Sequence, residues 1–219
     1  MEKQVLMPGV VVYKNAIPKE WNLIERYETA LTKPDSRFKW HGAEVGYGDR
    51  TESHRNCQDF KYKAEHLGEI DEYSKDLADM HNLISTSIWN CLDDYSRDYR
   101  ILVKYMEAIN VVKYGPGEYF NYHSDDGEPY RCTVSTVAYI NDDYEGGELD
   151  FSFFDLTWKP EAGDMIVFPS SYLYAHASLP IKNGTKYSLV TMTDRNEFAH
   201  YNDSPIYHNM ETRQQRGLV

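Results

Sequence analysis

Short β-prone runs separated by glycine and proline turns fill the second half of this chain, and they constrain its fold more than any other feature. A Gly-Pro-Gly turn at residues 115–117 separates two aromatic runs, and Gly146-Gly147 precedes another run. Residues 131–142 alternate small polar and apolar side chains, which is typical of a strand with one packed and one wet face. This punctuation favours a mainly β fold with flanking helices, whose core is a double-stranded β-helix (jelly roll) with a mouth that can hold a ligand.

Two histidines and one aspartate in this region form a candidate metal site. His123 and Asp125 are two residues apart, so on a strand their side chains would share one face, with Ser124 pointing away. His176 lies in a strand-like run further along. Each residue alone has an ordinary explanation, because most histidines lie on surfaces or are satisfied by one hydrogen bond. Together they match the facial arrangement of non-haem Fe(II) sites, which leaves the opposite face open for a co-substrate and O2.

A lysine ten residues after His176 completes the pattern. Lys186 opens the last β-prone run, directly after the turn at residues 182–185. Its ammonium group is suited to pairing with the far carboxylate of a 2-oxo acid through a charge-assisted hydrogen bond. The set of residues therefore predicts an oxygenase that depends on iron and 2-oxoglutarate.

Residues 105–193 resemble the catalytic domain of the prolyl 4-hydroxylase-type 2-oxoglutarate/Fe(II) dioxygenases. The resemblance implies Fe(II) bound by His123, Asp125 and His176, with 2-oxoglutarate and O2 as co-substrates and ascorbate as a candidate accessory reductant. It also implies hydroxylation of an unactivated C–H bond, with succinate and CO2 as co-products. The pattern that carries it reads Y-G-P-G-E-Y-F-N-Y-H-S-D, R-C-T-V-S-T-V-A-Y-I-N-D, G-G-E-L, K-P-E-A-G-D-M-I-V-F, then His176 and G-T-K-Y-S.

The resemblance assigns a co-substrate pocket as well. Lys186 would pair with the 5-carboxylate of 2-oxoglutarate, and Tyr139 and Tyr114 would line the same pocket. Ser188 or Thr191 would add a hydroxyl group. Ordinary core packing is the alternative for the two tyrosines, because the chain contains 19 tyrosines.

The chain departs from the family pattern near the expected substrate. Met192-Thr193 stands where many members carry a tryptophan, which counts against a collagen-like or polyproline substrate. Asp125 is intact, which counts against the halogenase variant of the site. The short connection from Asp126 to Arg131 leaves little lid over the mouth and favours an open groove, with Arg131 at its edge as a candidate substrate contact.

The 219 residues are predicted to form one dioxygenase domain. Within it, residues 1–104 would supply helical and strand support, residues from about 105 to 194 the catalytic jelly roll, and residues 195–219 a C-terminal arm.

Two helices are expected to support the outer face of the major sheet. One begins at Pro18 and runs to about Leu31, and the other covers about residues 70–97. Residues 50–55 are polar and are predicted to be a solvated loop, with a place near the mouth of the site as the alternative. The apolar positions expected to pack are Trp21, Ile24, Tyr27 and Leu31 in the first helix, and Ile70, Leu77, Ile84, Ile88, Cys91 and Tyr95 in the second.

Composition removes several classes of partner. The formal net charge of −12 disfavours binding to a nucleic-acid backbone and mildly favours a basic or neutral substrate. No run approaches the roughly 20 apolar residues of a membrane span, and the first residues lack an apolar signal core. Three cysteines at unpatterned spacings favour reduced thiols, and hence a cytoplasmic protein. The sequence carries no indication of an oligomeric state.

Three functions remain open at this point. The first is hydroxylation of a peptide or protein, with peptidyl proline preferred. The second is hydroxylation of a free amino acid or another small metabolite at the same iron site. The third is a non-catalytic, cupin-like metal- or ligand-binding module. Lys186 and Tyr139 count against this third reading, because a metal site alone needs no carboxylate anchor.

Overall fold

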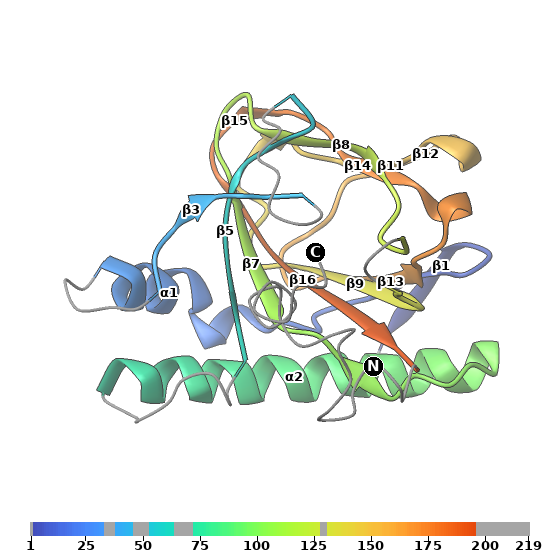
Figure 1. Ribbon diagram of the computed structural model, residues 1–219, viewed down its shortest axis with the longest axis horizontal. Coiled ribbons are helices and arrows are strands. Elements are labelled where there is room, and N and C mark those ends of the chain that lie inside the picture. The colour runs from blue at the N-terminus through green and yellow to red at the C-terminus, as the bar shows by residue number, and fades with distance from the viewer. Residues whose placement is uncertain (1, 33–37, 46–52, 64–71, 128–130, 196–219) are drawn as a thin grey trace, which may run out of the picture.

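The computed structural model describes residues 2–32, 38–45, 53–63, 72–127 and 131–195. In these residues two antiparallel sheets face each other, and two α-helices cover the outer side of the larger sheet (Figure 1). This arrangement confirms the predicted mainly β fold with a jelly-roll core and flanking helices. Ile70, residues 128–130 and residues 196–219 of the expected C-terminal arm lie outside the described residues.

The larger of the two sheets, called the major sheet here, has nine strands. In spatial order, it contains β1 (Lys3–Met7), β2 (Val10–Tyr13), β13 (Met165–Pro169), β9 (Val134–Tyr139), β16 (Lys186–Asp194), β7 (Ile109–Tyr114), β5 (Gln58–Tyr62) and β3 (His41–Gly42), with β6 (Tyr105–Met106) pairing with β16.

The smaller sheet, called the minor sheet, has five strands, and a separate two-stranded ribbon lies beside it. The minor sheet contains β12 (Leu156–Trp158), β11 (Leu149–Phe151), β14 (His176–Ser178), β8 (Tyr119–His123) and β4 (Arg55–Asn56), and the ribbon contains β10 (Glu145–Gly146) and β15 (Ile181–Asn183).

The central strands of the major sheet are buried on both faces. In β2, Val11 and Tyr13 join the core beneath the helices, whereas Val10 and Val12 join the core between the two sheets. All six residues of β9 are also buried, so the expectation of a wet face for the 131–142 segment is wrong. Ser135 and Thr136 of β9 satisfy their hydroxyl groups internally: Ser135 Oγ lies 2.8 Å from Ser170 Oγ, and Thr136 Oγ1 donates to the Thr191 carbonyl.

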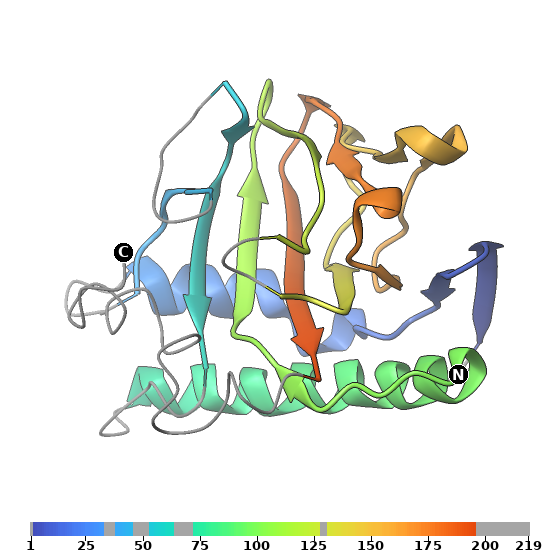
Figure 2. The same cartoon turned by 45° about the vertical axis from the view of Figure 1, so that its right-hand side comes forward.

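Both helices pack on the same side of the major sheet, as expected (Figure 2). The helix predicted from Pro18 is divided: a 3-10 turn, η1 (Lys19–Trp21), ends at Asn22, and α1 (Leu23–Thr32) follows. Asn22 has φ 51°, a left-handed conformation that asparagine tolerates, and the break shifts the buried face to Leu23, Tyr27, Ala30 and Leu31.

The second helix, α2 (Glu72–Tyr99), is continuous and begins close to the predicted start. Leu77, Ile84, Ile88, Cys91 and Tyr95 are all buried in the core beneath the major sheet, as predicted. Neither this helix nor the other helices among the described residues is both long enough and apolar enough to cross a membrane.

We expect the α2 interface to be a main source of stability. Ile84 is fully buried, and Ile84→Ala should lower the free energy of unfolding by about 2–5 kcal/mol, because the deletion leaves a cavity. Its neighbour Leu83 is 39% exposed, so Leu83→Ala should change stability by no more than about 0.5 kcal/mol. Urea unfolding of the two variants compares them directly, and equal losses would contradict this assignment of the buried face.

Candidate active site

The three predicted metal ligands come together at the mouth of the jelly roll. His176 opens β14 and lies opposite His123, the last residue of β8, in the antiparallel pairing of these strands. Asp125 follows two residues after the end of β8, so His123 and Asp125 do not share a strand as expected, yet they converge. Asp125 Oδ1 lies 3.5 Å from His123 Nε2, and Asp125 Oδ2 lies 3.9 Å from His176 Nε2. One donor atom from each residue falls within 4.8 Å of the others.

Backbone carbonyl groups orient both imidazole rings. His123 Nδ1 lies 2.8 Å from the Asn121 carbonyl oxygen, and His176 Nδ1 lies 3.0 Å from the Tyr174 carbonyl oxygen. A carbonyl can only accept, so each Nδ1 carries the proton and each Nε2 keeps its lone pair on the side of Asp125. Metal-binding histidines are commonly fixed in this way, with the second nitrogen bonded to a carbonyl or carboxylate.

The electrostatics of the site suit a divalent cation. Burial lowers the pKa of His176 to about 4, which keeps the ring neutral and able to bind metal. Burial acts to raise the pKa of Asp125, but the neighbouring His176 and His123 outweigh this effect and bring it to about 2. An ionised carboxylate and neutral imidazole are the protonation states that metal ligation requires.

Lys186 is buried, and its side chain reaches β14, the strand that carries His176. Its ammonium donates hydrogen bonds to the Gly147 carbonyl oxygen at 2.9 Å and to Ser178 Oγ at 2.7 Å. It also lies 4.9 Å from the ring centre of Tyr114 and 5.4 Å from that of Tyr139. Gly147 has φ 65°, and a Cβ atom there would come within 3.2 Å of the Lys186 side chain. The lysine is thus held between two tyrosine rings in a pocket without room for an added methyl group.

The predicted pocket residues lie on one face of three neighbouring strands. Lys186 of β16 pairs with Tyr114 of β7, and Ser188 of β16 pairs with Tyr139 of β9. Side chains alternate along β16, so Lys186 and Ser188 share the face of Tyr114 and Tyr139, whereas Thr191 belongs to the opposite face. Thr191 lies on the side of the helices and does not join this set.

Tyr139 provides an independent indication of a missing ligand atom. Its hydroxyl group is fully buried and has no hydrogen-bond partner. Burial raises its pKa well above the usual value, so the group remains protonated and able to donate. An unpaired buried hydroxyl beside a buried ammonium fits an anionic oxygen, such as one end of a dicarboxylate.

Arg131, the predicted substrate contact, is exposed at the described end of the connection that leads to β9. Its position among the surface residues allows contact with a bound molecule.

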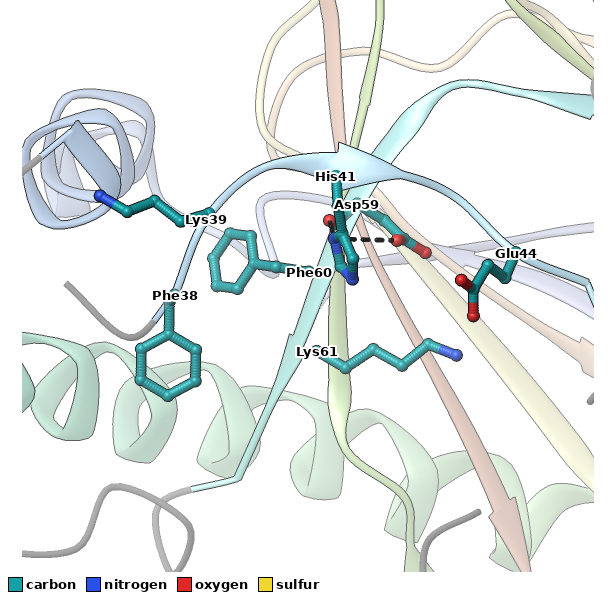
Figure 3. A pocket seen from close by; sticks show the side chains of 7 residues that line it. All are labelled: Phe38, Lys39, His41, Glu44, Asp59, Phe60 and Lys61. Atoms are coloured by element: carbon teal, nitrogen blue, oxygen red, sulfur yellow. Dashed lines mark hydrogen bonds and ion pairs between the residues drawn. The ribbon is translucent and has the colours of Figure 1, made fainter. Parts of the chain in front are cut away.

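The sequence interpretation missed Arg55. Residues 50–52 lie outside the described residues, but Arg55 begins β4, is only 8% exposed and is therefore not part of a solvated loop. It binds Asp59 at 3.0 Å, and Asp59 also lines a hollow of about 420 Å³ beside β3 and β5 (Figure 3). The only sequence signal was the strand-like run that follows Arg55, which is too short to identify a pairing partner.

Comparison with known proteins shows which family this chain resembles. Residues 109–193 match the family model of the 2OG-Fe(II) oxygenase superfamily. A PKHD-type hydroxylase of Rippkaea orientalis is 28% identical over 115 residues, which are 48% of this chain and 50% of the relative. The chain spans about half the length of the curated relatives it matches.

Two solved structures show the same fold. A prolyl hydroxylase of Trichoplax adhaerens, in complex with a hypoxia inducible factor oxygen degradation domain peptide fragment, has a TM-score of 0.65 at 13% identity, covering 84% of this chain and 83% of that chain. The viral collagen prolyl hydroxylase of Paramecium Bursaria Chlorella virus-1, in its 2OG complex, has a TM-score of 0.59 at 18% identity, covering 84% and 95%. Residues 109–193 of this chain thus match the 2OG-Fe(II) oxygenase superfamily, and the chain resembles its prolyl 4-hydroxylase-type members.

Proposed function

We propose that this protein is an Fe(II)- and 2-oxoglutarate-dependent dioxygenase that hydroxylates an unactivated C–H bond, with peptidyl proline as its substrate. The observation that carries the proposal is the presence of two features that meet at strand β14. One is the set His123, Asp125 and His176, and the other is the enclosed ammonium of Lys186 beside the unpaired Tyr139 hydroxyl. A metal-storage module would need only the first feature.

Each residue has a defined part in this proposal. His123, Asp125 and His176 would hold Fe(II) through one face, and the bound metal would supply O2 activation coupled to conversion of 2-oxoglutarate to succinate and CO2. Lys186 and Tyr139 would bind the far carboxylate and so orient the co-substrate. Tyr114 and Ser188 would line the same pocket. Ascorbate would serve as an accessory reductant.

Several observations support a peptide as the substrate. One structural relative is a prolyl hydroxylase bound to a peptide fragment. Large apolar side chains are exposed in two turns next to the minor sheet: Phe153 in η3 (Ser152–Phe154), and Tyr172 and Leu173 in η4 (Tyr172–Tyr174). Exposed aromatic surfaces are a common way of binding proline-containing segments. Arg131 would contact the same substrate, and a free amino acid or other small metabolite is the competing substrate class.

The thiols support the expected cellular setting. Cys57, Cys91 and Cys132 are all free, and the first two are buried. Free thiols are typical of a reducing compartment, so a cytoplasmic location is part of the proposal.

The first test is succinate formation from 2-oxoglutarate with Fe(II), ascorbate and O2, with and without proline-containing peptides. Turnover should rise with a peptide. Asp125→Ala should lower it about 100-fold or more, since loss of a metal ligand should exceed the 10- to 100-fold effect of outer-shell changes. Lys186→Met should raise the KM for 2-oxoglutarate about 10- to 100-fold, the equivalent of a hydrogen bond to a charged group.

Two exposed residues provide matched controls. Asp93→Ala in α2 and Lys182→Met make the same kinds of change at exposed positions and should leave turnover unaltered. Turnover that no peptide increases would replace the peptide substrate with a small molecule. Absence of 2-oxoglutarate binding by the metal-loaded protein would overturn the enzyme proposal.

The affinity for 2-oxoglutarate should also depend on pH. Burial lowers the pKa of Lys186 to about 7, with a further lowering by Lys159 that Cys57 and Glu148 partly oppose. Below this pH the ammonium is already charged. Above it, the protein must take up a proton when it binds the dianion, so the apparent Kd should rise about tenfold per pH unit.

Calorimetric titration of the Mn²⁺-loaded protein between about pH 6.5 and pH 9 measures this dependence. Lys186→Arg is the informative variant, because a guanidinium stays charged throughout this range and should flatten the profile. If the unaltered protein binds 2-oxoglutarate with one affinity at all these pH values, Lys186 does not act as the proposed anchor.

A further inference from the structure

Phe120 lies against the metal ligand His123 because of an irregularity in β8. The pairing of β8 with β14 shifts by one residue between the pairs His123–His176 and Phe120–Ser178, so two residues of β8 oppose Ala177. Residues three apart on a regular strand would face opposite sides, and a bulge of this kind brings them to the same side. The two rings are stacked, with centres 3.6 Å apart and planes inclined by 15°.

Arg55 lies over the Phe120 ring of this pair. Its strand β4 pairs with β8, with Arg55 directly opposite Phe120, and the guanidinium carbon lies 4.8 Å from the centre of the Phe120 ring. Arg55 is itself held by Asp59 at 3.0 Å and by the Glu44 carbonyl oxygen at 2.8 Å. A column of successive contacts therefore extends from the buried carboxylate of Asp59 through Arg55 and Phe120 to the imidazole of His123.

The orientation of the His123 side chain is restricted less by burial than the orientations of His176 and Asp125. The side chain of His123 is 17% exposed, compared with 6% for His176 and 4% for Asp125. His176 is confined by Phe168 and Phe151, whose ring centres lie 4.8 and 5.7 Å from its own. For His123, the hydrogen bond from Nδ1 fixes one edge of the ring, but only a neighbour against its face prevents the ring from tilting.

We propose that Arg55 is a positioning residue for the iron site, which acts through Phe120 to fix the plane of His123. This inference rests on the proposed metal function of the site. The planar guanidinium matters more than its charge, because it lies over the face of an aromatic ring while its N–H groups bind Asp59 and Glu44. Loss of the column should weaken metal binding and alter the coordination geometry without touching the carboxylate anchor at Lys186.

The test is a double-mutant cycle on metal binding. Arg55→Lys keeps a cation beside Asp59 but lacks the planar group, and Phe120→Leu keeps an apolar side chain but removes the ring. We expect each change to raise the Kd for Mn²⁺ about 10- to 100-fold, the range seen when outer-shell partners of metal ligands are altered. Arg55→Lys should add no further loss in the F120L background, since it acts through the ring. Calorimetry provides the affinities, and the visible absorption of the Co²⁺ form reports the geometry.

Lys113 provides the matched control. It also pairs with a carboxylate, Glu28, at 2.7 Å, and it lies over the Trp40 and Tyr187 rings, but on the helix side of the major sheet. Lys113→Met should lower the thermal midpoint of the metal-free protein but leave the Kd for Mn²⁺ and the Co²⁺ spectrum unchanged.

The outcomes separate this inference from the proposed function. If the unaltered protein binds Mn²⁺ and Asp125→Ala abolishes binding, the metal site stands. An Arg55→Lys variant that then binds Mn²⁺ normally, or that loses equal affinity with and without Phe120, would overturn the positioning role. If the unaltered protein does not bind Mn²⁺ at all, the metal site fails and the positioning role fails with it.

Discussion

The antiparallel pairing of β8 with β14 determines where the reactive end of this molecule lies. Each of these short strands carries one histidine, and His123 of β8 lies opposite His176 of β14. The chain that follows β8 brings the carboxylate of Asp125 close to both rings. The pairing is possible because the minor sheet closes over the major sheet, with a shared core that includes Phe151 and Phe168. The same two rings contact His176, so Phe151 and Phe168 belong to the apolar core and also border the polar site.

Burial has opposite consequences at the two ends of the cavity. At the mouth it keeps His176 neutral, which favours metal binding, and the ionised Asp125 is stabilised by its histidine neighbours. At the inner end it disfavours the charged form of Lys186 until an anion arrives. A buried ammonium group lowers the stability of the unliganded protein, and the proposed anion would offset this cost.

Much of this arrangement could be predicted from the sequence because its signals are local. His123 and Asp125 are only two residues apart, and Lys186 follows His176 by ten residues, so each pair can be recognised within a short segment. The glycine and proline turns that separate the runs indicate a jelly roll. Tyr139 was assigned through the family pattern, and its role stays a prediction; in the structure its buried hydroxyl has no hydrogen-bond partner.

The remaining features depend on relations between distant segments. The role proposed for Arg55 depends on the pairing of β4 with β8 and on the shift of register between β8 and β14. Neither feature can be recognised from the residue types in the sequence. Ser188 and Thr191 were equivalent candidates until β16 proved to be one uninterrupted strand, on which only Ser188 shares the face of Lys186. The break at Asn22 likewise reflects a backbone conformation that asparagine permits but does not require.

The short strand β14 also carries both ends of the proposed co-substrate site. His176 begins it, and Ser178, which accepts a hydrogen bond from Lys186, ends it two residues later on the same face. Two residues of extended chain span about 7 Å, and hydrogen bonds to the strands on either side prevent this length from changing. The strand therefore fixes the distance between His176 and the hydroxyl group that binds Lys186. A dicarboxylic acid held by metal at one end and by ammonium at the other would be selected by its carbon count, so shorter and longer homologues with identical end groups would be poor substitutes.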